Sequence, residues 1–383
     1  MISKKKKVML VFGTRPEAIK MAPVYKILKS RPNAFDVMCC VSAQHREMLD
    51  TVLETFDIMP DVDLNIMKPG QDLFDVTSSV LVKMRDVLRE HRPDAVLVHG
   101  DTTTTMAASL ACFYENVSLG HVEAGLRTFD LQAPFPEELN RQITSKLATW
   151  HFAPTETSRE NLLAERVPDS AIHITGNTVI DALHFVVARL EDDAVRRTEI
   201  DSLLDSELRF DWRTERFVLI TGHRRENFGE GFLQICRALQ DLSIAYPETN
   251  FVYPVHLNPN VGDPVRAHLS GRSNVHLISP MTYEPFVRLL KHAMLVLTDS
   301  GGIQEEAPGL GKPVLVMREV TERPEAVEAG TVRLVGADRE RIVANVSELL
   351  DNPKSYLAMS KAHNPYGDGL AACRIADVLE VSK

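Results

Sequence analysis

The stretch Val8-Met9-Leu10-Val11-Phe12-Gly13-Thr14-Arg15-Pro16-Glu17 indicates the fold class of this 383-residue chain. Its first five residues are apolar and predict a buried strand, whereas a secretion signal needs a run of about 7–15 apolar residues. Pro16 suits the first turn of a helix, because the N–H that proline lacks would have no partner there. A buried strand that passes straight into a helix is the unit from which parallel sheets are built.

Short apolar runs and longer helical stretches alternate along the rest of the chain. Further strands are predicted at residues 36–41, 95–99, 117–121, 149–153, 171–174, 217–221, 250–255, 274–278, 294–298, 313–316 and 331–335, and helices at 17–29, 75–90 and 370–381. Residues 191–216 are charged and poor in strand signals. We therefore expect an α/β fold of two Rossmann-like, doubly wound domains, residues 1–178 and 179–365. Residues 366–383 are expected to form a helix that packs back on the first domain. Since parallel sheets bind ligands beyond the carboxyl ends of their strands, we also expect a ligand cleft between the domains.

The composition argues against several classes of protein. Lys and Arg number 43 against 53 Asp and Glu, and the resulting net charge of −10 argues against a nucleic-acid partner. No segment approaches the about 18–20 apolar residues of a membrane span, so no membrane partner is expected. The five cysteines form no Cys-x-x-Cys pair. This pattern favours reduced thiols in the cytoplasm and argues against a metal site.

Two strand–helix junctions have features of a phosphate site. At Gly13-Thr14-Arg15 the new helix would offer free N–H groups to an anion, and Lys20 adds a second cation. At Ser300-Gly301-Gly302 a capping serine and two glycines would let a phosphate approach the backbone, with Glu306 on the same helical face. Either junction could instead be an ordinary turn. Neither contains Gly-x-Gly-x-x-Gly, so a dinucleotide cofactor is not expected.

Acidic residues follow strand ends in the first half of the chain. Asp101 follows strand 95–99, Glu123 follows strand 117–121, and Glu137 opens a helix four residues before Arg141. Each has a structural alternative, with Asp101 as a helix cap and Glu137 as a partner of Arg141. Because the carboxyl ends of parallel strands meet at one edge of a sheet, the acids together predict carboxylates that face a ligand. His223, after strand 217–221, is a candidate proton carrier or phosphate ligand.

Longer motifs resemble those of the bacterial non-hydrolysing UDP-N-acetylglucosamine 2-epimerases. They are residues 11–20 (VFGTRPEAIK), 98–105 (VHGDTTTT), 120–127 (GHVEAGLR), 136–138 (PEE), 222–226 (GHRRE), 254–259 (PVHLNP), 298–308 (TDSGGIQEEAP) and 321–325 (TERPE). The resemblance runs in the family's order from Val8 to about Gly369. It implies a GT-B arrangement of the two domains, often a homodimer, and reversible conversion of UDP-GlcNAc to UDP-ManNAc through a 2-acetamidoglucal. It implies no cofactor.

The resemblance also implies roles for individual residues. Loss of the proton on carbon-2 must be coupled to departure of UDP, which needs donors around the diphosphate and acid–base groups on both sugar faces. We expect Asp101 and Glu137 to carry protons, and Glu123 either to do the same or to orient the sugar. The residues expected around the nucleotide sugar are Arg15, Lys20, Arg141, His223, Phe286 beside the uracil, Ser300, Gly301, Gly302, Glu306 on the ribose hydroxyls, and Arg323.

Many bacterial members of that family bind a second UDP-GlcNAc that activates turnover. The matching positions are Gln44, His45, Gln71, Glu138, Arg224 and His256. Gly70 stands where some regulated members carry an arginine, which puts such regulation in doubt here. The main alternative function is a GT-B glycosyltransferase that uses a UDP-sugar donor, which would share the second-domain site without needing the three acids. A hydrolysing 2-epimerase or a nucleotide-sugar sensor would differ in releasing free ManNAc or in lacking turnover.

Overall fold

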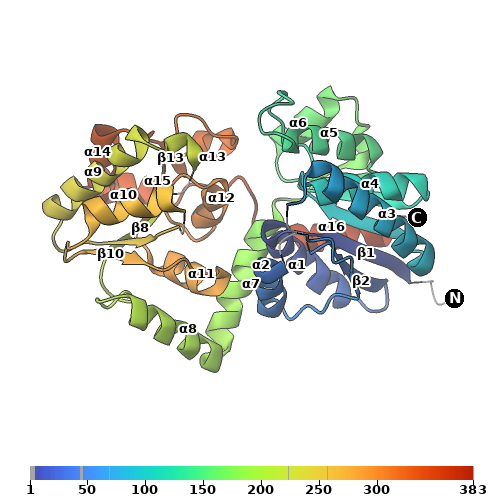
Figure 1. The fold of residues 1–383 in the computed structure, drawn as a ribbon, viewed down its shortest axis with the longest axis horizontal. Helices are drawn as coiled ribbons and strands as arrows, with labels where there is room; N and C mark the ends of the chain where they lie inside the picture. Colours follow the sequence, from blue (N-terminus) through green and yellow to red (C-terminus); the bar gives the residue numbers. More distant parts are fainter. Residues whose placement is uncertain (1–4, 44–45, 69, 223, 257, 383) are drawn as a thin grey trace. The chain divides into compact units, whose positions relative to one another are not determined.

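The computed structural model describes residues 5–43, 46–68, 70–222, 224–256 and 258–382. The chain forms two compact units, one of Met1–His184 with Tyr366–Lys383 and the other of Phe185–Pro365. Each unit is built around one parallel sheet with helices packed on it (Figure 1). The first crossing between the units lies inside helix α7 (Thr178–Asp192), and the second lies in the segment before Tyr366.

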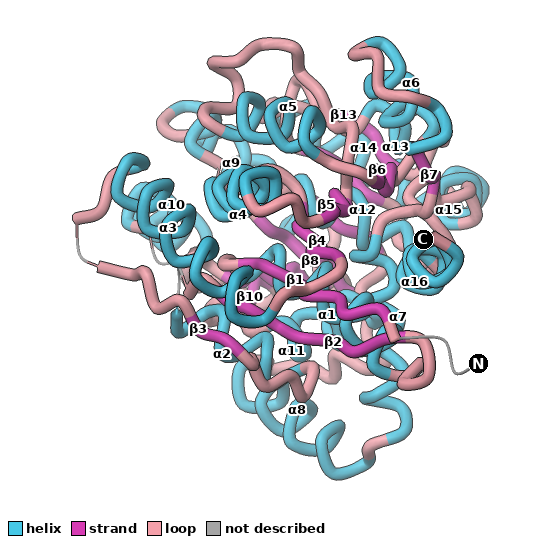
Figure 2. The backbone as a smooth tube through the Cα atoms, turned by 90° about the vertical axis from the view of Figure 1, so that its right-hand side faces the viewer, coloured by secondary structure: helices cyan, strands magenta, loops and turns pink. Residues whose placement is uncertain are grey.

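The sheet of the first unit has the strand order β3-β2-β1-β4-β5-β6-β7, and every pairing is parallel (Figure 2). Its strands are β1 (Lys6–Phe12), β2 (Phe35–Val41), β3 (Val62–Asp63), β4 (Ala95–His99), β5 (Ser118–Val122), β6 (Trp150–Ala153) and β7 (Ile172–Ile174). Residues 8–12 of β1 are wholly buried. Burial on both faces explains why this strand is an unbroken apolar run rather than an alternating one.

Helices and one short 3-10 turn connect these strands. They are α1 (Arg15–Lys29), α2 (Arg46–Thr55), α3 (Leu73–His91), α4 (Thr103–Tyr114), α5 (Glu137–Leu147), α6 (Glu156–Ala164), η1 (Asp169–Ala171) and the first half of α7. Side chains that accept hydrogen bonds at helix starts explain several boundaries, because the first N–H groups of a helix have no partner within it. Thr102, for example, accepts from Thr105 N–H at 3.1 Å at the start of α4.

The last helix, α16 (Ala371–Val381), belongs to the first unit, where it packs against α1 (Figure 1). Both of its ends are anchored. The Asp181 carboxylate accepts hydrogen bonds from the N–H groups of Ala371 and Ala372 at 3.2 and 2.8 Å. The Lys6 ammonium donates to the carbonyl of Leu379 at 2.6 Å, a favourable place for a cation because carbonyls at a helix end carry partial negative charge.

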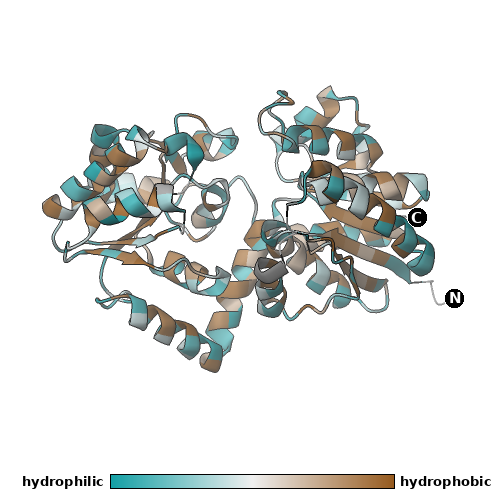
Figure 3. Ribbon diagram, viewed as in Figure 1, coloured by the Kyte–Doolittle hydropathy of each residue, from teal (hydrophilic) through white to brown (hydrophobic). Residues whose placement is uncertain are grey.

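The sheet of the second unit has the order β10-β9-β8-β11-β12-β13 and is also parallel. Its strands are β8 (Phe217–Thr221), β9 (Asn250–Pro254), β10 (Val275–Ile278), β11 (Leu295–Thr298), β12 (Val314–Val316) and β13 (Val332–Leu334). Its connections are α8 (Ala194–Glu207), η2 (Arg225–Asn227), α9 (Glu230–Ala245), α10 (Pro259–Leu269), α11 (Tyr283–His292), α12 (Gly301–Gly309), α13 (Pro324–Glu328), α14 (Arg339–Asp351) and α15 (Pro353–Ser360). Apolar residues gather on these strands and on the helix faces that cover them (Figure 3).

The predicted α/β class with parallel sheets is confirmed, and each of the predicted strands is present to within one or two residues. The structure adds β3, which sequence patterns missed because it has only two residues, Val62 and Asp63. Among the described residues, no helix is long and apolar enough to cross a membrane.

Candidate functional site

The ends of β4 and β5 bring two of the candidate acids to one edge of the first sheet. Asp101 follows β4 and Glu123 follows β5, and these strands pair directly, with His99 opposite Val122. The backbone turns sharply at both places, because Gly100 and Glu123 have φ values of +64° and +62°. A Cβ atom on Gly100 would lie 3.4 Å from Glu123 Oε2, so the turn after one strand lies directly against the carboxylate that follows the next.

The Glu123 carboxylate is nearly buried and has several polar neighbours. Lys20 on α1 donates to Oε1 in a close ion pair, and Asn177 Nδ2 donates to the same oxygen at 3.0 Å. His99 Nε2 lies 3.5 Å from Oε2. Burial lowers the pKa of His99 to about 4, so this histidine is a neutral neighbour at pH 7. The structure thus brings Lys20, which was predicted near the nucleotide sugar, onto a candidate acid.

Asp101 has a pKa that lies well above the ordinary value of an aspartate. Burial, reinforced by the negative charges of Glu123 and Glu137, raises its pKa to about 6, against the opposing effect of the Arg141 guanidinium. Arg141 Nη2 lies 3.4 Å from Asp101 Oδ2, and about a third of the aspartate side chain stays exposed (33%). A carboxyl group with this pKa exchanges a proton readily near neutral pH, as a general acid or base must.

Helix α5 contributes the third acid and the cation. Glu137 is its first residue and is half-buried, and its carbonyl accepts from Arg141 Nε at 3.4 Å. Asn140 on the same helix donates to the carbonyl of Asp101 at 2.9 Å. The start of α5 is therefore attached to the Asp101 loop in two ways, by the hydrogen bond from Asn140 and by the ion pair between Arg141 and Asp101. Sequence reasoning found Glu137 and Arg141 but had no signal for Asn140.

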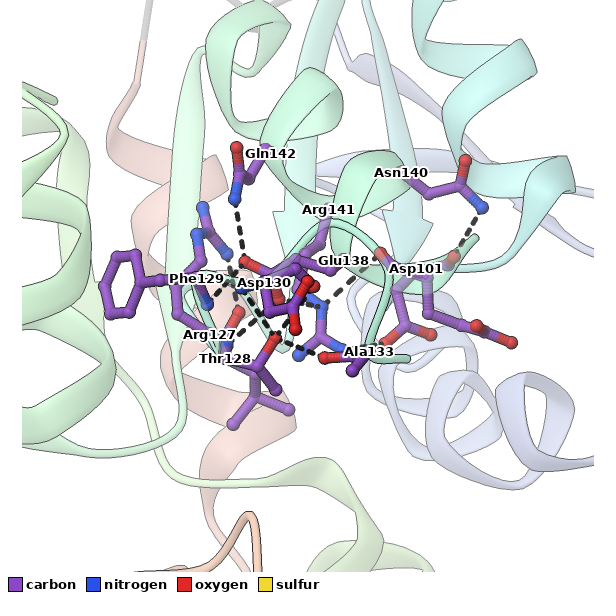
Figure 4. A network of polar contacts seen from close by, with 12 residues as sticks. Asp101, Arg127, Thr128, Phe129, Asp130, Ala133, Glu138, Asn140, Arg141 and Gln142 are labelled. Atoms are coloured by element: carbon purple, nitrogen blue, oxygen red, sulfur yellow. Dashed lines mark hydrogen bonds and ion pairs between the residues drawn. The ribbon is translucent and has the colours of Figure 1, made fainter. Parts of the chain in front are cut away.

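Glu138, the neighbour of Glu137, is wholly buried and holds the loop that precedes α5 (Figure 4). Its carboxylate accepts the N–H groups of Thr128 at 3.0 Å and Phe129 at 3.1 Å, and the Gln142 amide at 2.7 Å. Arg141 Nε lies 3.3 Å from it, so the guanidinium stands between Glu138 and Asp101 (Figure 4).

The charged form of Glu138 is favoured despite its burial. Burial alone would raise its pKa, but the hydrogen bonds from Thr128, Gln142 and Phe129 and the Arg141 charge together lower it. A carboxylate enclosed in this way fixes the loop and the position of Arg141. Its predicted contact with a second nucleotide sugar stays a prediction.

A further buried carboxylate, Glu17, changes the interpretation of the junction at the start of α1. Its Oε2 accepts from the N–H groups of Gly13 and Thr14 at 3.0 and 2.8 Å, and its Oε1 accepts from Thr102 Oγ1 at 2.7 Å. The N–H groups of Gly13 and Thr14, which precede α1, are therefore bound by the helix's own glutamate rather than by an anion. The signal was present in the sequence, since Thr14 and Glu17 have the spacing of a capping box. An anion at the N–H groups of the helix itself and at Arg15 stays a prediction.

Gly13 is required for space rather than for a special backbone conformation. A Cβ atom at this position would lie 1.9 Å from Ser42 Oγ and 2.8 Å from Thr104 Oγ1. Ser42 and Thr104 are themselves joined by a hydrogen bond of 2.9 Å. The ends of β1 and β2 and the start of α4 therefore meet at this glycine, which brings the half-buried Arg15 to the same edge as Asp101.

In the second unit, the buried Asp299 joins the two loops that carry candidate ligand residues. It follows β11, and its Oδ2 accepts from Arg224 N–H at 2.9 Å and from Asn227 Nδ2 at 3.3 Å. Both donors lie in the segment after β8, so the loops after the two central strands are held together. The next residue, Ser300, precedes α12, but its hydroxyl makes no capping bond among the described residues, contrary to expectation.

Helix α12 and the residues around it form the rest of this site. A Cβ on Gly302 would lie 3.8 Å from Glu306 Oε2, and Glu306 Oε1 accepts from the hydroxyl of the buried Tyr283 at 2.8 Å. Tyr283 was not anticipated, because nothing in the sequence links α11 to α12. The half-buried Phe286 lies one turn further along α11.

Arg323 covers the first glycine of α12. A Cβ on Gly301 would lie 2.6 Å from Arg323 Nη1, and Arg323 Nε donates to the buried Glu305 at 2.7 Å. The ion pair with Glu305 holds a cation at the N-terminus of α12, where free helix N–H groups already favour anions. The structure thus brings Gly301, Gly302, Glu306 and Arg323 together, and their contact with a nucleotide sugar stays a prediction.

The remaining predicted residues are described only in part. His223, Gln44 and His45 lie outside the described residues. Gln71 accepts from the backbone N–H of Lys68 at 2.7 Å, and His256 is exposed, with Nδ1 accepting from Asn258 N–H at 3.1 Å. Their proposed roles stay predictions.

Comparisons with known proteins agree on one family. A family model described as "UDP-N-acetylglucosamine 2-epimerase" matches residues 26–380. The UDP-N-acetylglucosamine 2-epimerase of Escherichia coli strain K12 is 58% identical over 374 residues, 98% of each chain. The crystal structure of UDP-GlcNAc 2-epimerase from Neisseria meningitidis bound to UDP-GlcNAc is 51% identical, with a TM-score of 0.88 over 97% of this chain and 99% of that chain.

A more distant likeness bears on the fold. The structure of MurG from Acinetobacter baumannii matches with a TM-score of 0.58 at 14% identity, over 98% of this chain and 100% of that chain. At this identity the match shows the fold alone. Together with the match to the Neisseria structure, it shows that the two α/β units have the GT-B type of fold.

Proposed function

The chain belongs to the UDP-N-acetylglucosamine 2-epimerase family. We propose that the two units of the chain have different tasks in the reaction. The first unit moves the proton on carbon-2 of UDP-GlcNAc, and the second unit binds UDP while it leaves and returns. The observation that carries this proposal is the meeting of Asp101 and Glu123 at one sheet edge beside Glu137, with the Asp101 pKa raised to about 6.

The reaction requires a base and an acid on opposite faces of the sugar. One group removes the proton from carbon-2 while the bond between carbon-1 and the UDP oxygen breaks. The electron pair of the carbon–oxygen bond leaves with UDP, and the electron pair of the carbon–hydrogen bond forms the new double bond. The product is a 2-acetamidoglucal with a double bond between carbon-1 and carbon-2. UDP then adds back to carbon-1 while a second group delivers a proton to the other face of carbon-2. We assign Asp101 and Glu137 to proton transfer, and Glu123 to proton transfer or to holding the sugar.

Departure of UDP is favoured by positive charge, because negative charge develops on the diphosphate. We assign this role to the start of α12 with Arg323, and to Arg15 and His223. Glu306, oriented by the Tyr283 hydroxyl, would accept hydrogen bonds from the two ribose hydroxyls. The similar Neisseria enzyme was crystallised with UDP-GlcNAc bound, which supports this class of ligand.

Solvent-deuterium incorporation at carbon-2 tests the assignment. The enzyme is incubated in D2O with UDP-GlcNAc as its only substrate, and proton NMR follows both UDP-ManNAc and loss of the carbon-2 proton signal. We expect wild-type enzyme to epimerise and exchange, and Asp101→Asn and Glu137→Gln each to lose at least about 100-fold of the rate, as general acid–base groups do. Wild-type exchange in Asp101→Asn, Glu123→Gln and Glu137→Gln would refute the assignment.

The same experiment separates the rival function. A glycosyltransferase needs an acceptor, so it would leave UDP-GlcNAc unchanged under these conditions. A hydrolysing enzyme would accumulate free ManNAc and UDP instead of UDP-ManNAc. Each result is visible in the same NMR spectra.

We further propose a cytoplasmic homodimer that supplies ManNAc units for cell-surface polysaccharide. The location is supported by the cysteines, all five of which are free thiols. Sedimentation of the purified chain over a range of concentrations checks the oligomeric state.

A further inference from the structure

Asn177 lies between β7 and α7, just before the chain passes from the first unit to the second. Its side chain is almost wholly buried, and each of its polar groups has a partner. Its N–H donates to the carbonyl of Tyr366 at 2.7 Å, and its Oδ1 accepts from Val179 N–H at 3.1 Å. Its Nδ2 donates to Glu123 Oε1 at 3.0 Å. With both ends of the amide engaged, the side chain is held in one orientation.

The backbone around Asn177 is held by the segment of chain that returns to the first unit. Gly176 and Gly367 approach so closely that a Cβ on Gly367 would lie 3.3 Å from the Cα of Gly176. One turn along α7, Asp181 accepts the first N–H groups of α16. The outgoing and returning segments are thus fastened to each other on both sides of Asn177, which therefore has a rigid base.

Glu123 needs such an external support because of where it lies. It follows the end of β5 with a left-handed backbone conformation and lies outside the regular strand. Its Oε1 atom is shared between Lys20, on a long flexible side chain, and the short amide of Asn177. The flexible Lys20 side chain supplies a positive charge to Glu123. The short Asn177 side chain, hydrogen-bonded at both ends of its amide, fixes the position of the Glu123 carboxylate.

We propose that Asn177 is a positioning residue for Glu123, and this inference rests on the proposed function in which Glu123 acts on the sugar. The amide has no titratable proton and takes no part in proton transfer itself. Its hydrogen bond determines where the two carboxylate oxygens point, and the fastened crossing of the chain determines where Asn177 lies. Loss of the Nδ2 donor therefore acts on the reaction only through Glu123.

A double-mutant cycle tests this dependence, because residues that act through one another have effects that do not add. The four proteins are wild type, Asn177→Asp, Glu123→Gln and the double variant, compared by kcat, KM and carbon-2 exchange in D2O. Asn177→Asp keeps the size of the side chain and the Oδ1 acceptor for Val179. It replaces the donor to Glu123 with an acceptor that can carry a negative charge, so repulsion between the two carboxylates adds to the loss of the hydrogen bond. Asn161→Asp is the matched control, since Asn161 Nδ2 donates at 3.0 Å to the carbonyl of Gly125 rather than to a carboxylate.

We expect kcat of Asn177→Asp to fall at least about tenfold, the loss typical of a hydrogen bond to a charged group, with Asn161→Asp within about twofold of wild type. In the Glu123→Gln background, Asn177→Asp should cost less than about twofold more. Asn177→Ser, which keeps a short hydroxyl beside Val179, replaces Asn177→Asp if the latter does not fold.

Two results would overturn the proposal. One is wild-type kcat in a folded Asn177→Asp or Asn177→Ser protein. The other is a double variant whose loss equals the product of the two single losses, since Asn177 would then act independently of Glu123. If Glu123→Gln itself kept wild-type kcat and exchange, the role proposed for Glu123 would fail first, and that result is distinguishable because it appears in the single variant.

Discussion

Replacing Arg141 by methionine should raise the pKa of Asp101 and move the pH profile of the enzyme. Arg141 Nη2 lies 3.4 Å from Asp101 Oδ2, and its positive charge opposes the burial that raises the Asp101 pKa to about 6. At this distance an effective dielectric constant of about 20 gives an attraction of about 5 kcal/mol. Water screens part of it, because a third of the Asp101 side chain is exposed (33%).

We therefore expect a pKa change at the lower end of the range for an aspartate beside an arginine, about one to two units or about 1.4–2.7 kcal/mol. Removing a cation disfavours the carboxylate, so the shift is upward, to between about 7 and 8. The assay is kcat/KM for UDP-GlcNAc from pH 5 to pH 9, which reports groups of the free enzyme. In this pH profile, we assign to Asp101 the change in kcat/KM that has its midpoint near pH 6. The value of kcat/KM rises through this midpoint with increasing pH if Asp101 acts as a base, and falls if Asp101 acts as an acid.

Whether Asp101 acts as acid or as base, its midpoint in the kcat/KM profile must move to higher pH in Arg141→Met. Arg89→Met is the control for net charge, since Arg89 is exposed and pairs with Glu115 at 2.8 Å on the surface of the same unit. Thermal unfolding checks that the buried Glu138 tolerates the loss of its cation. A midpoint that stays at pH 6 or moves down in a folded Arg141→Met protein would refute the electrostatic reasoning.

Three further variants test other parts of the structure. Asp101→Asn should raise stability at pH 7 by about 1–3 kcal/mol, because an amide escapes the penalty on a buried carboxylate whose pKa is raised from 3.8 to about 6. That gain should be full above pH 6 and vanish as the pH falls to 4 in urea unfolding; an unchanged midpoint at pH 7 would contradict it. Glu17→Ala should lower the free energy of unfolding by about 3–5 kcal/mol, since it leaves buried donors at the starts of α1 and α4 without partners, whereas Glu17→Gln should cost less than half as much. Tyr283→Phe should weaken UDP binding about fivefold in calorimetry, because Glu306 loses the donor that orients it, while Tyr356→Phe should have no effect.

Much of the fold could be predicted because the central strands are short, largely apolar runs with helical periodicity on both sides. Residues 8–12, 95–99 and 217–221 illustrate this, since they are strands in the structure almost to the residue. The two-residue strand β3 could not be predicted, because Val62 and Asp63 are too few to show a periodicity.

The candidate acids could be predicted for a related reason. Asp101 and Glu123 follow strand ends, and the rule that parallel strands end at one edge brings them together without further information. At the start of α1 the sequence contains two signals, one for an anion site and one for a capping box. The structure shows that Glu17 accepts from the N–H groups of Gly13 and Thr14, a contact that the sequence analysis did not anticipate.

The sequence by itself determined the α/β class, the strand positions and the residues that follow the strand ends, because these depend on periodicity and order along the chain. Only the tertiary structure decided the partners of each carboxylate. Glu123 contacts Lys20 and Asn177, Asp101 contacts Arg141, and Glu306 contacts Tyr283. Each of these pairs joins residues that are far apart in the sequence and belong to different elements. Hydrogen bonds and charge effects act over a few ångströms in space, so the pKa of Asp101 and the orientation of Glu123 depend on packing that no local pattern encodes.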